Sequence, residues 1–110
     1  MTKQELLQLH EDTMDKCREI MQKKNADYTG GSEDPFANFR VSEVMGVPAE
    51  QGILLRVMDK MQRIKSFILK GELKVENESA EDACEDVINY MILIKGMMRE
   101  SNNPNKFDSN

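Results

Sequence analysis

Hydrophobic positions recur at helical spacing in three long segments of the chain. The first set is Leu6, Leu9, Thr13, Cys17 and Ile20. Positions three or four residues apart lie on one face of a helix. Thr2 followed by Glu5 is a capping-box pattern, which marks a helix start. We therefore predict a first helix from about Lys3 to Asn25.

The second and third segments also carry start and stop signals. Their apolar positions are Ile53, Val57, Met61, Ile64 and Ile68, and then Val87, Met91, Ile94 and Met98. Pro48 suits a first helical turn and Gly71 suits a helix stop. Ser79, followed by Asp82, is the expected N-cap of the last helix, which should run to about Glu100. A short helical turn is expected at 42–45.

No repeat and no strand-like alternation stands out, so we expect an all-α fold. Its architecture should be a small bundle of three main helices with a long aromatic-containing loop between the first and second. At 110 residues the chain is one small domain, 1–100, followed by a flexible tail, 101–110. The chain has nine methionines, and three helices alone cannot easily bury both of the methionine-rich faces. We therefore expect a homo-oligomer, a dimer or higher.

The loop between the first two helices, residues 25–40, has an unusual composition. Two adjacent glycines and a proline forbid a regular helix there. Yet the loop holds three of the six aromatic residues of the chain, Tyr28, Phe36 and Phe39. Two alternatives remain open: the aromatic side chains pin the loop to the core, or they form a lid over a planar ligand.

Two rows of opposite charge lie on consecutive helices. The basic row is Arg56, Lys60 and Arg63. The acidic row is Glu78, Asp82 and Asp86, and Asn89 continues the same helical stripe. Antiparallel packing would bring the rows together as interhelical ion pairs, which contribute about 0–1 kcal/mol each. Alternatively, both rows line a cleft, where cations hold phosphate oxygens and carboxylates bind Mg²⁺, ribose or a base.

The sequence carries few signals for catalysis. Asp82 and Asp86, four residues apart, can share a hard cation, so a magnesium ion is possible at this pair although no cofactor is required. The single histidine, His10, gives no basis for a catalytic dyad. Cys17 and Cys84 are expected to be reduced thiols in the core, on apolar helix faces. Nucleophilic catalysis therefore finds no support.

Charge and hydropathy narrow the class of partner. A net charge of −5 argues against a nucleic acid polymer as partner. No apolar run approaches the roughly 20 residues of a membrane span, and the amino terminus lacks the regions of an export signal. We expect a cytoplasmic protein that does not enter a membrane.

Four short patterns occur in a specific order between about Lys23 and Leu93. They are K-N-x-D-Y-x-G, D-P-F-x-N-F, R-x-x-x-K-x-x-R and E-S-x-x-D-x-x-x-D-x-x-N-Y. This ordered set resembles the nucleotide modification associated domain, type 1, a family of small helical phage and bacterial proteins distantly similar to MazG-type pyrophosphohydrolases. The resemblance implies a nucleotide ligand at Lys24, Asp27, Tyr28, Asn38, Arg56, Lys60, Arg63, Asp82, Asp86 and Asn89, and we add Phe36 from the aromatic loop.

The chain departs from the MazG type at its metal ligands. MazG-type enzymes carry E-x-x-E on one helix and E-x-x-D on the next, whereas the corresponding first helix here offers three cations. Cations suit the binding of phosphates better than a metal-assisted attack on them. Together with these cations, the resemblance implies a phage-type protein that binds a nucleotide or nucleotide-derived signal and could sequester it in an anti-defence role. The alternative is a Mg²⁺-dependent nucleotide pyrophosphohydrolase or nucleotide-modification enzyme.

Overall fold

The computed structural model describes residues 1–29, 31–71 and 79–101, and for residues 26–29 the description covers the backbone. These residues form four helices and no strand, which confirms the all-α prediction. The helices are α1 (Lys3–Thr29), the 3₁₀ helix η1 (Ala37–Met45), α2 (Ala49–Lys70) and α3 (Ala80–Ser101). Most of the predicted tail, residues 102–110, lies outside this description. None of the described helices is both long enough and apolar enough to span a membrane.

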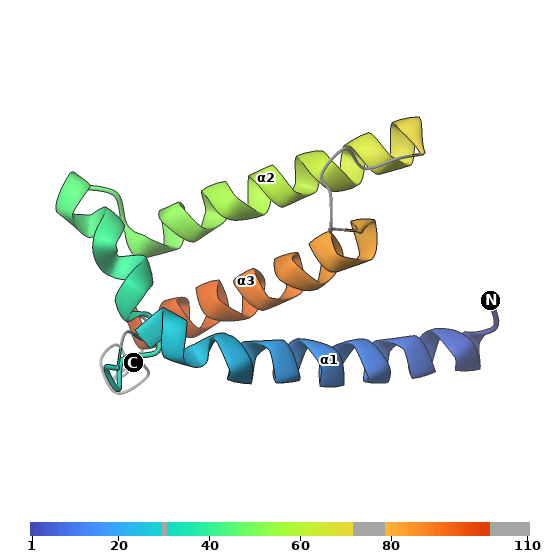
Figure 1. Cartoon of the computed structure of the whole chain (residues 1–110), viewed down its shortest axis with the longest axis horizontal. Coiled ribbons are helices and arrows are strands. Elements are labelled where there is room, and N and C mark those ends of the chain that lie inside the picture. The colour runs from blue at the N-terminus through green and yellow to red at the C-terminus, as the bar shows by residue number, and fades with distance from the viewer. Residues whose placement is uncertain (30, 72–78, 102–110) are drawn as a thin grey trace, which may run out of the picture.

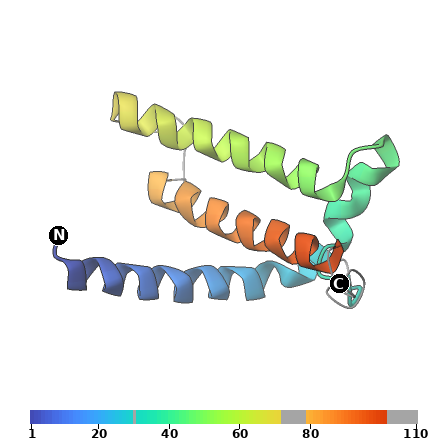
Figure 2. The same cartoon turned by 180° about the vertical axis from the view of Figure 1, so that it is seen from behind.

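The helix α3 is the central element of the fold. It lies between α1 and α2 in Figure 1, and the view from behind in Figure 2 shows the same order. The short helix η1 closes the end of the molecule where α2 begins and α3 finishes. Consequently α3 makes two separate seams, one with α2 and one with α1.

Local signals set the ends of the long helices. The backbone N–H of Glu5 donates to Thr2 Oγ1 at 3.1 Å, and the N–H of Thr2 donates back to the Glu5 carboxylate at 3.3 Å. Ser79 and Asp82 make the same reciprocal pair at 3.0 Å in each direction. At the end of α2, Gly71 has φ 76°, the left-handed conformation that glycine adopts without strain.

The segment between α1 and α2 is more regular than the sequence suggested. Helix α1 continues to Thr29, past the expected end at Asn25, and η1 already begins at Ala37. The prediction of a long loop over 25–40 is therefore wrong at both of its ends. For η1 the reason is tertiary: Phe36 and Phe39 are buried, and the N–H of Phe39 donates to the Phe36 carbonyl at 2.9 Å, which closes a 3₁₀ turn.

The core lies where η1, α2 and α3 meet. Its buried members are Phe36, Phe39, Ala49, Ile53, Leu93 and Met97. Several predicted core positions are instead exposed, namely Leu6, Leu9, Met61, Ile68, Met91 and Met98. On α3 the buried line passes through Leu93 and Met97, because this helix packs against neighbours on two sides.

Candidate functional site

Each cation of the basic row has a partner in the fold. The Lys60 Nζ lies 2.9 Å from a carboxylate oxygen of Asp86 on α3, and the side chains of both residues are largely buried. Arg63 pairs at 3.1 Å with Asp59, one turn back on the same helix. The Lys60–Asp86 contact is the interhelical ion pair that was one of the two alternatives for these rows.

Arg56 is held differently. Its guanidinium lies over the Phe39 ring, 5.3 Å from the ring centre. Within the described part of the chain, no carboxylate lies within ion-pair distance of Arg56. A guanidinium stacked on an aromatic ring is oriented but keeps its in-plane N–H donors available. Arg56 is therefore the member of the row best placed to bind an anion.

A pocket of about 320 Å³ opens beside Arg56, between η1 and α2. Its lining residues are Asn38, Phe39, Val41, Ser42, Gly52, Ile53 and Arg56. A Cβ added at Gly52 would lie 3.2 Å from Ser42 Oγ, so glycine lets α2 approach η1 closely here. The Ser42 hydroxyl donates to the Val47 carbonyl at 2.9 Å, which fixes the end of η1. The pocket unites Asn38 and Arg56, two predicted site residues from different elements.

Two carboxylates of the acidic row make contacts that stabilise the helices. The Asp82 carboxylate accepts the Ser79 N–H, and hydrogen bonding from the backbone and then the side chain of Ser79 holds the pKa of the Asp82 carboxyl below its ordinary value. Asp86 is paired with Lys60, and Glu78 lies outside the described residues. Among the described residues, no group of three or more His, Cys, Asp or Glu side chains is placed to hold a metal ion.

Asn89 lies in the other seam of α3. Its Nδ2 donates to the Cys17 carbonyl of α1 at 3.0 Å, and the residue is 4% exposed. This bond fixes the amide orientation, because a carbonyl can only accept. The Asn89 Oδ1 is buried and has no hydrogen-bond partner among the described residues. Asn89 therefore does not join Arg56 and Asn38 in one pocket, although the sequence grouped them.

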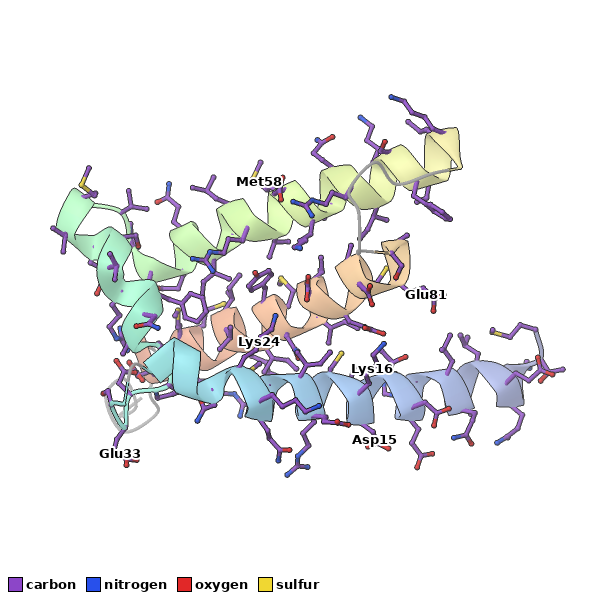
Figure 3. The ribbon with its side chains drawn as sticks, viewed as in Figure 1. Asp15, Lys16, Lys24, Glu33, Met58 and Glu81 are labelled. Atoms are coloured by element: carbon purple, nitrogen blue, oxygen red, sulfur yellow. The ribbon has the colours of Figure 1, made fainter. Side chains whose placement is uncertain are left out.

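The remaining predicted residues are scattered. Phe36 lies in the core, as the first of the two alternatives for the loop proposed. Lys24 is exposed on the side of α1 that faces α3 in Figure 3. The side chains of Asp27 and Tyr28 lie outside the description, so their roles stay predictions.

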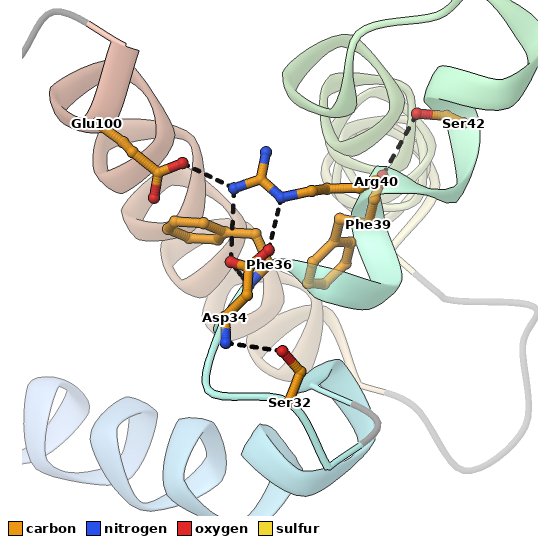
Figure 4. Close-up of polar contacts among 7 residues, drawn as sticks. All are labelled: Ser32, Asp34, Phe36, Phe39, Arg40, Ser42 and Glu100. Carbon is orange, nitrogen blue, oxygen red and sulfur yellow. Dashed lines mark hydrogen bonds and ion pairs between the residues drawn. The ribbon is translucent and has the colours of Figure 1, made fainter.

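Two polar clusters were not predicted. Arg40 Nε lies 2.6 Å from an Asp34 carboxylate oxygen, and Arg40 Nη2 lies 2.7 Å from Glu100 on α3 (Figure 4). The Arg40 guanidinium and the Phe36 N–H hold the pKa of the Asp34 carboxyl below its ordinary value. The sequence separates Arg40 from Glu100 by sixty residues, so no local pattern reveals this cluster.

The second unpredicted cluster joins α1 to α3. Lys16 Nζ lies 3.1 Å from the Glu85 carboxylate, whose side chain is mostly buried. The Cys17 Sγ donates to the Glu85 carbonyl at 3.8 Å, and burial raises the pKa of the Cys17 thiol. Both cysteines are free thiols, but Cys84 is exposed, so its predicted place on a buried face is wrong.

Comparison of the chain with protein-family models, with curated proteins and with solved structures finds no match. The resemblance to the nucleotide modification associated domain therefore stays a prediction. The site combines an aromatic-stacked arginine with an amide and a hydroxyl in the lining of one pocket.

Proposed function

We propose that the protein binds a nucleotide or a nucleotide-derived signal molecule in the pocket between η1 and α2 and holds it without turnover. The observation that carries the proposal is Arg56, which stacks on Phe39 and lines the pocket. An arginine fork matches the oxygens of a phosphate group bidentately, and a second planar ring can stack on its outer face. The order of short sequence patterns described above supports the same ligand class.

The pocket offers complementary groups for the rest of such a ligand. The Asn38 amide has both donors and an acceptor, which suits the edge of a base or a ribose hydroxyl. The volume of about 320 Å³ lies at the low end of the roughly 300–1,000 Å³ of small-molecule sites. One mononucleotide unit of the ligand would occupy this pocket. Any further phosphates would lie toward the polar side of α2.

The structural roles of the acidic side chains favour holding the ligand over hydrolysing it. Asp82 caps α3 and Asp86 neutralises Lys60, so both carboxylates already have structural roles. A phage protein of this kind would act by sequestering a signal of host defence, as a cytoplasmic homo-oligomer. The Mg²⁺-dependent pyrophosphohydrolase or nucleotide-modification enzyme is the alternative outcome of the test.

Calorimetric titration against a panel of mono-, di-, tri- and cyclic nucleotides tests the proposal. We expect saturable binding, weakened roughly tenfold or more by Arg56→Gln and partly kept by Arg56→Lys, which retains the charge but not the fork. Arg18→Gln, which removes an exposed arginine from α1, is the matched control and should bind like the wild type.

Two results would overturn the proposal. Absence of binding to every nucleotide at high micromolar concentration would reject the ligand class. Release of phosphate or pyrophosphate during incubation of the bound nucleotide with Mg²⁺ would reject holding and favour the enzyme, whereas recovery of the intact ligand supports holding.

A further inference from the structure

One side of the α2–α3 pair is an apolar surface that nothing in the described chain covers. Its members, called here the α2–α3 apolar face, are Leu54, Met58, Met61, Ile68, Met91 and Met98. Their exposed fractions range from 46% for Leu54 and Met91 to 72% for Ile68. Single exposed apolar side chains are normal, but a contiguous group of this size marks an interaction site.

Helix geometry places these residues together, opposite the polar side. The Lys60–Asp86 ion pair marks one side of the seam between two antiparallel helices. Leu54 and Met61 are about 120° and 100° around α2 from Lys60, toward the other side, at roughly 100° per residue. On α3, Met91 follows Asp86 by five residues and lies about 140° around the helix from it, at roughly 100° per residue. In Figure 3 the labelled Met58 projects from α2 away from α3.

The overall dimensions agree with a chain that leaves a face open. Its radius of gyration is 16.4 Å, whereas a compact domain of this length has a radius of about 13 Å. The three long helices form a layer with α3 in the middle (Figures 1 and 2). A layer buries its central helix and leaves broad faces that a second layer can cover.

Charges at the ends of the face indicate what covers it. Along α2 the stripe Leu54, Met58 and Met61 is preceded by Glu50 and followed by Lys65, at spacings of four, four, three and four. An antiparallel copy of α2 centred near Met58 would set Leu54 opposite Met61 of the second copy. The same register sets Glu50 opposite Lys65 of the second copy, twice by symmetry. A stripe that is apolar in the middle and oppositely charged at its ends is complementary to itself.

We propose that the α2–α3 apolar face is the interface of a two-fold homodimer, in which α2 packs antiparallel on α2 of a second copy around Met58. The α2 and α3 helices of both copies then form a four-helix bundle with a methionine-rich core. The polar side with Arg56 and the seam with α1 stay open, so dimer formation does not depend on nucleotide binding.

The test measures the mass of the full chain in solution by light scattering and sedimentation. We expect about twice the chain mass of 12.7 kDa for the wild type. Met58→Glu, which places two like charges at the axis, should give the 12.7 kDa species with unchanged helical content. Val44→Glu on η1, at a position 86% exposed and away from the face, is the matched control and should remain dimeric.

A charge exchange tests the register without altering the apolar core. Glu50→Lys or Lys65→Glu alone should raise the dimer dissociation constant roughly tenfold, since each sets like charges opposite one another twice. The double variant, Glu50→Lys with Lys65→Glu, should restore the wild-type constant. A wild-type monomer, a Met58→Glu variant that stays dimeric, or a double variant no better than the singles would each overturn the proposal.

Discussion

The two seams of α3 differ in what holds them together. The seam with α2 and η1 is an apolar core around Ile53 and Phe39, with its Lys60–Asp86 pair at the edge. The seam with α1 has fewer apolar members, Cys17 and Met21, beside polar contacts from Lys16 to Glu85 and from Asn89 to the Cys17 carbonyl. Buried apolar area drives folding, while polar contacts chiefly fix orientation. We infer that η1, α2 and α3 supply most of the stability and that α1 is the more easily detached element.

Two surface hollows lie along α1. One of about 450 Å³ is lined in part by Met14, Met21 and Asn89, and one of about 400 Å³ lies beside Leu6, Leu9 and Met14. Both are open to the surface, as is the pocket between η1 and α2, so the difference between the seams rests on the contacts that each seam makes.

The largest expected loss of stability comes from a substitution in the seam of α3 with α2 and η1. Ile53 is 1% exposed, so Ile53→Ala should lower the free energy of unfolding by about 2–4 kcal/mol. Leu7→Ala on α1, at a position 64% exposed, should change it by less than about 0.5 kcal/mol. Urea denaturation followed by circular dichroism measures both. Similar losses for the two variants would contradict the assignment of Ile53 to the stabilising core.

A smaller effect is expected from the ion pair of the α1 seam, and it should be asymmetric. Lys16→Met leaves the mostly buried Glu85 carboxylate without its cation, whereas Glu85→Gln leaves Lys16 in solvent. The first variant should therefore be the less stable one, with a loss smaller than that of Ile53→Ala. Equal losses in urea denaturation would show that the Glu85 carboxylate is better solvated than its burial implies.

The same pair should make the α1 seam sensitive to alkali. The hydrogen bond to Glu85 raises the pKa of Lys16 above its ordinary value of 10.5. The stability that this pair contributes is thus fully present below that value and is lost as the pH rises through the raised pKa. Lys16→Met should lack this alkaline component of the unfolding curve.

The smallest effect concerns Asp34, whose side chain is 33% exposed. After allowance for solvent screening, Asp34→Asn should cost about 0.5 kcal/mol. Because Arg40 lowers the pKa of Asp34 below 3.8, this contribution is present above pH 3.8 and is lost as the pH falls through the folded-state pKa. Acid titration of stability in wild type and Asp34→Asn should converge at low pH, and parallel curves would contradict it.

The sequence predicted what depends on near neighbours. Ser79 and Asp82 mark the start of α3, and Gly71 marks the end of α2, because caps are interactions between residues within one turn. It also predicted that the basic and acidic rows would meet, and Lys60 and Asp86 do so.

The sequence did not predict what depends on distant packing. The sequence predicted a helical turn at 42–45, but not that η1 already begins at Ala37, where it packs around Phe36 and Phe39 in the core. Helical spacing identified Asn89 as a neighbour of Asp86, but it could not tell that the two side chains face different helices. The pocket beside Arg56 likewise needs Ser42 and Gly52, which carry no chemical signal of their own.

The hydrogen bond from Asn89 to the Cys17 carbonyl makes the Asn89 amide a probe of whether α1 is attached to α3. One of the two Nδ2 protons is held by a carbonyl and the residue is 4% exposed, so that proton should exchange slowly with deuterium and resonate apart from its geminal partner. Every detachment of α1 breaks this bond and releases the proton to water. A single side-chain amide signal in a ¹⁵N spectrum would then follow the opening of α1 while the rest of the bundle stays folded.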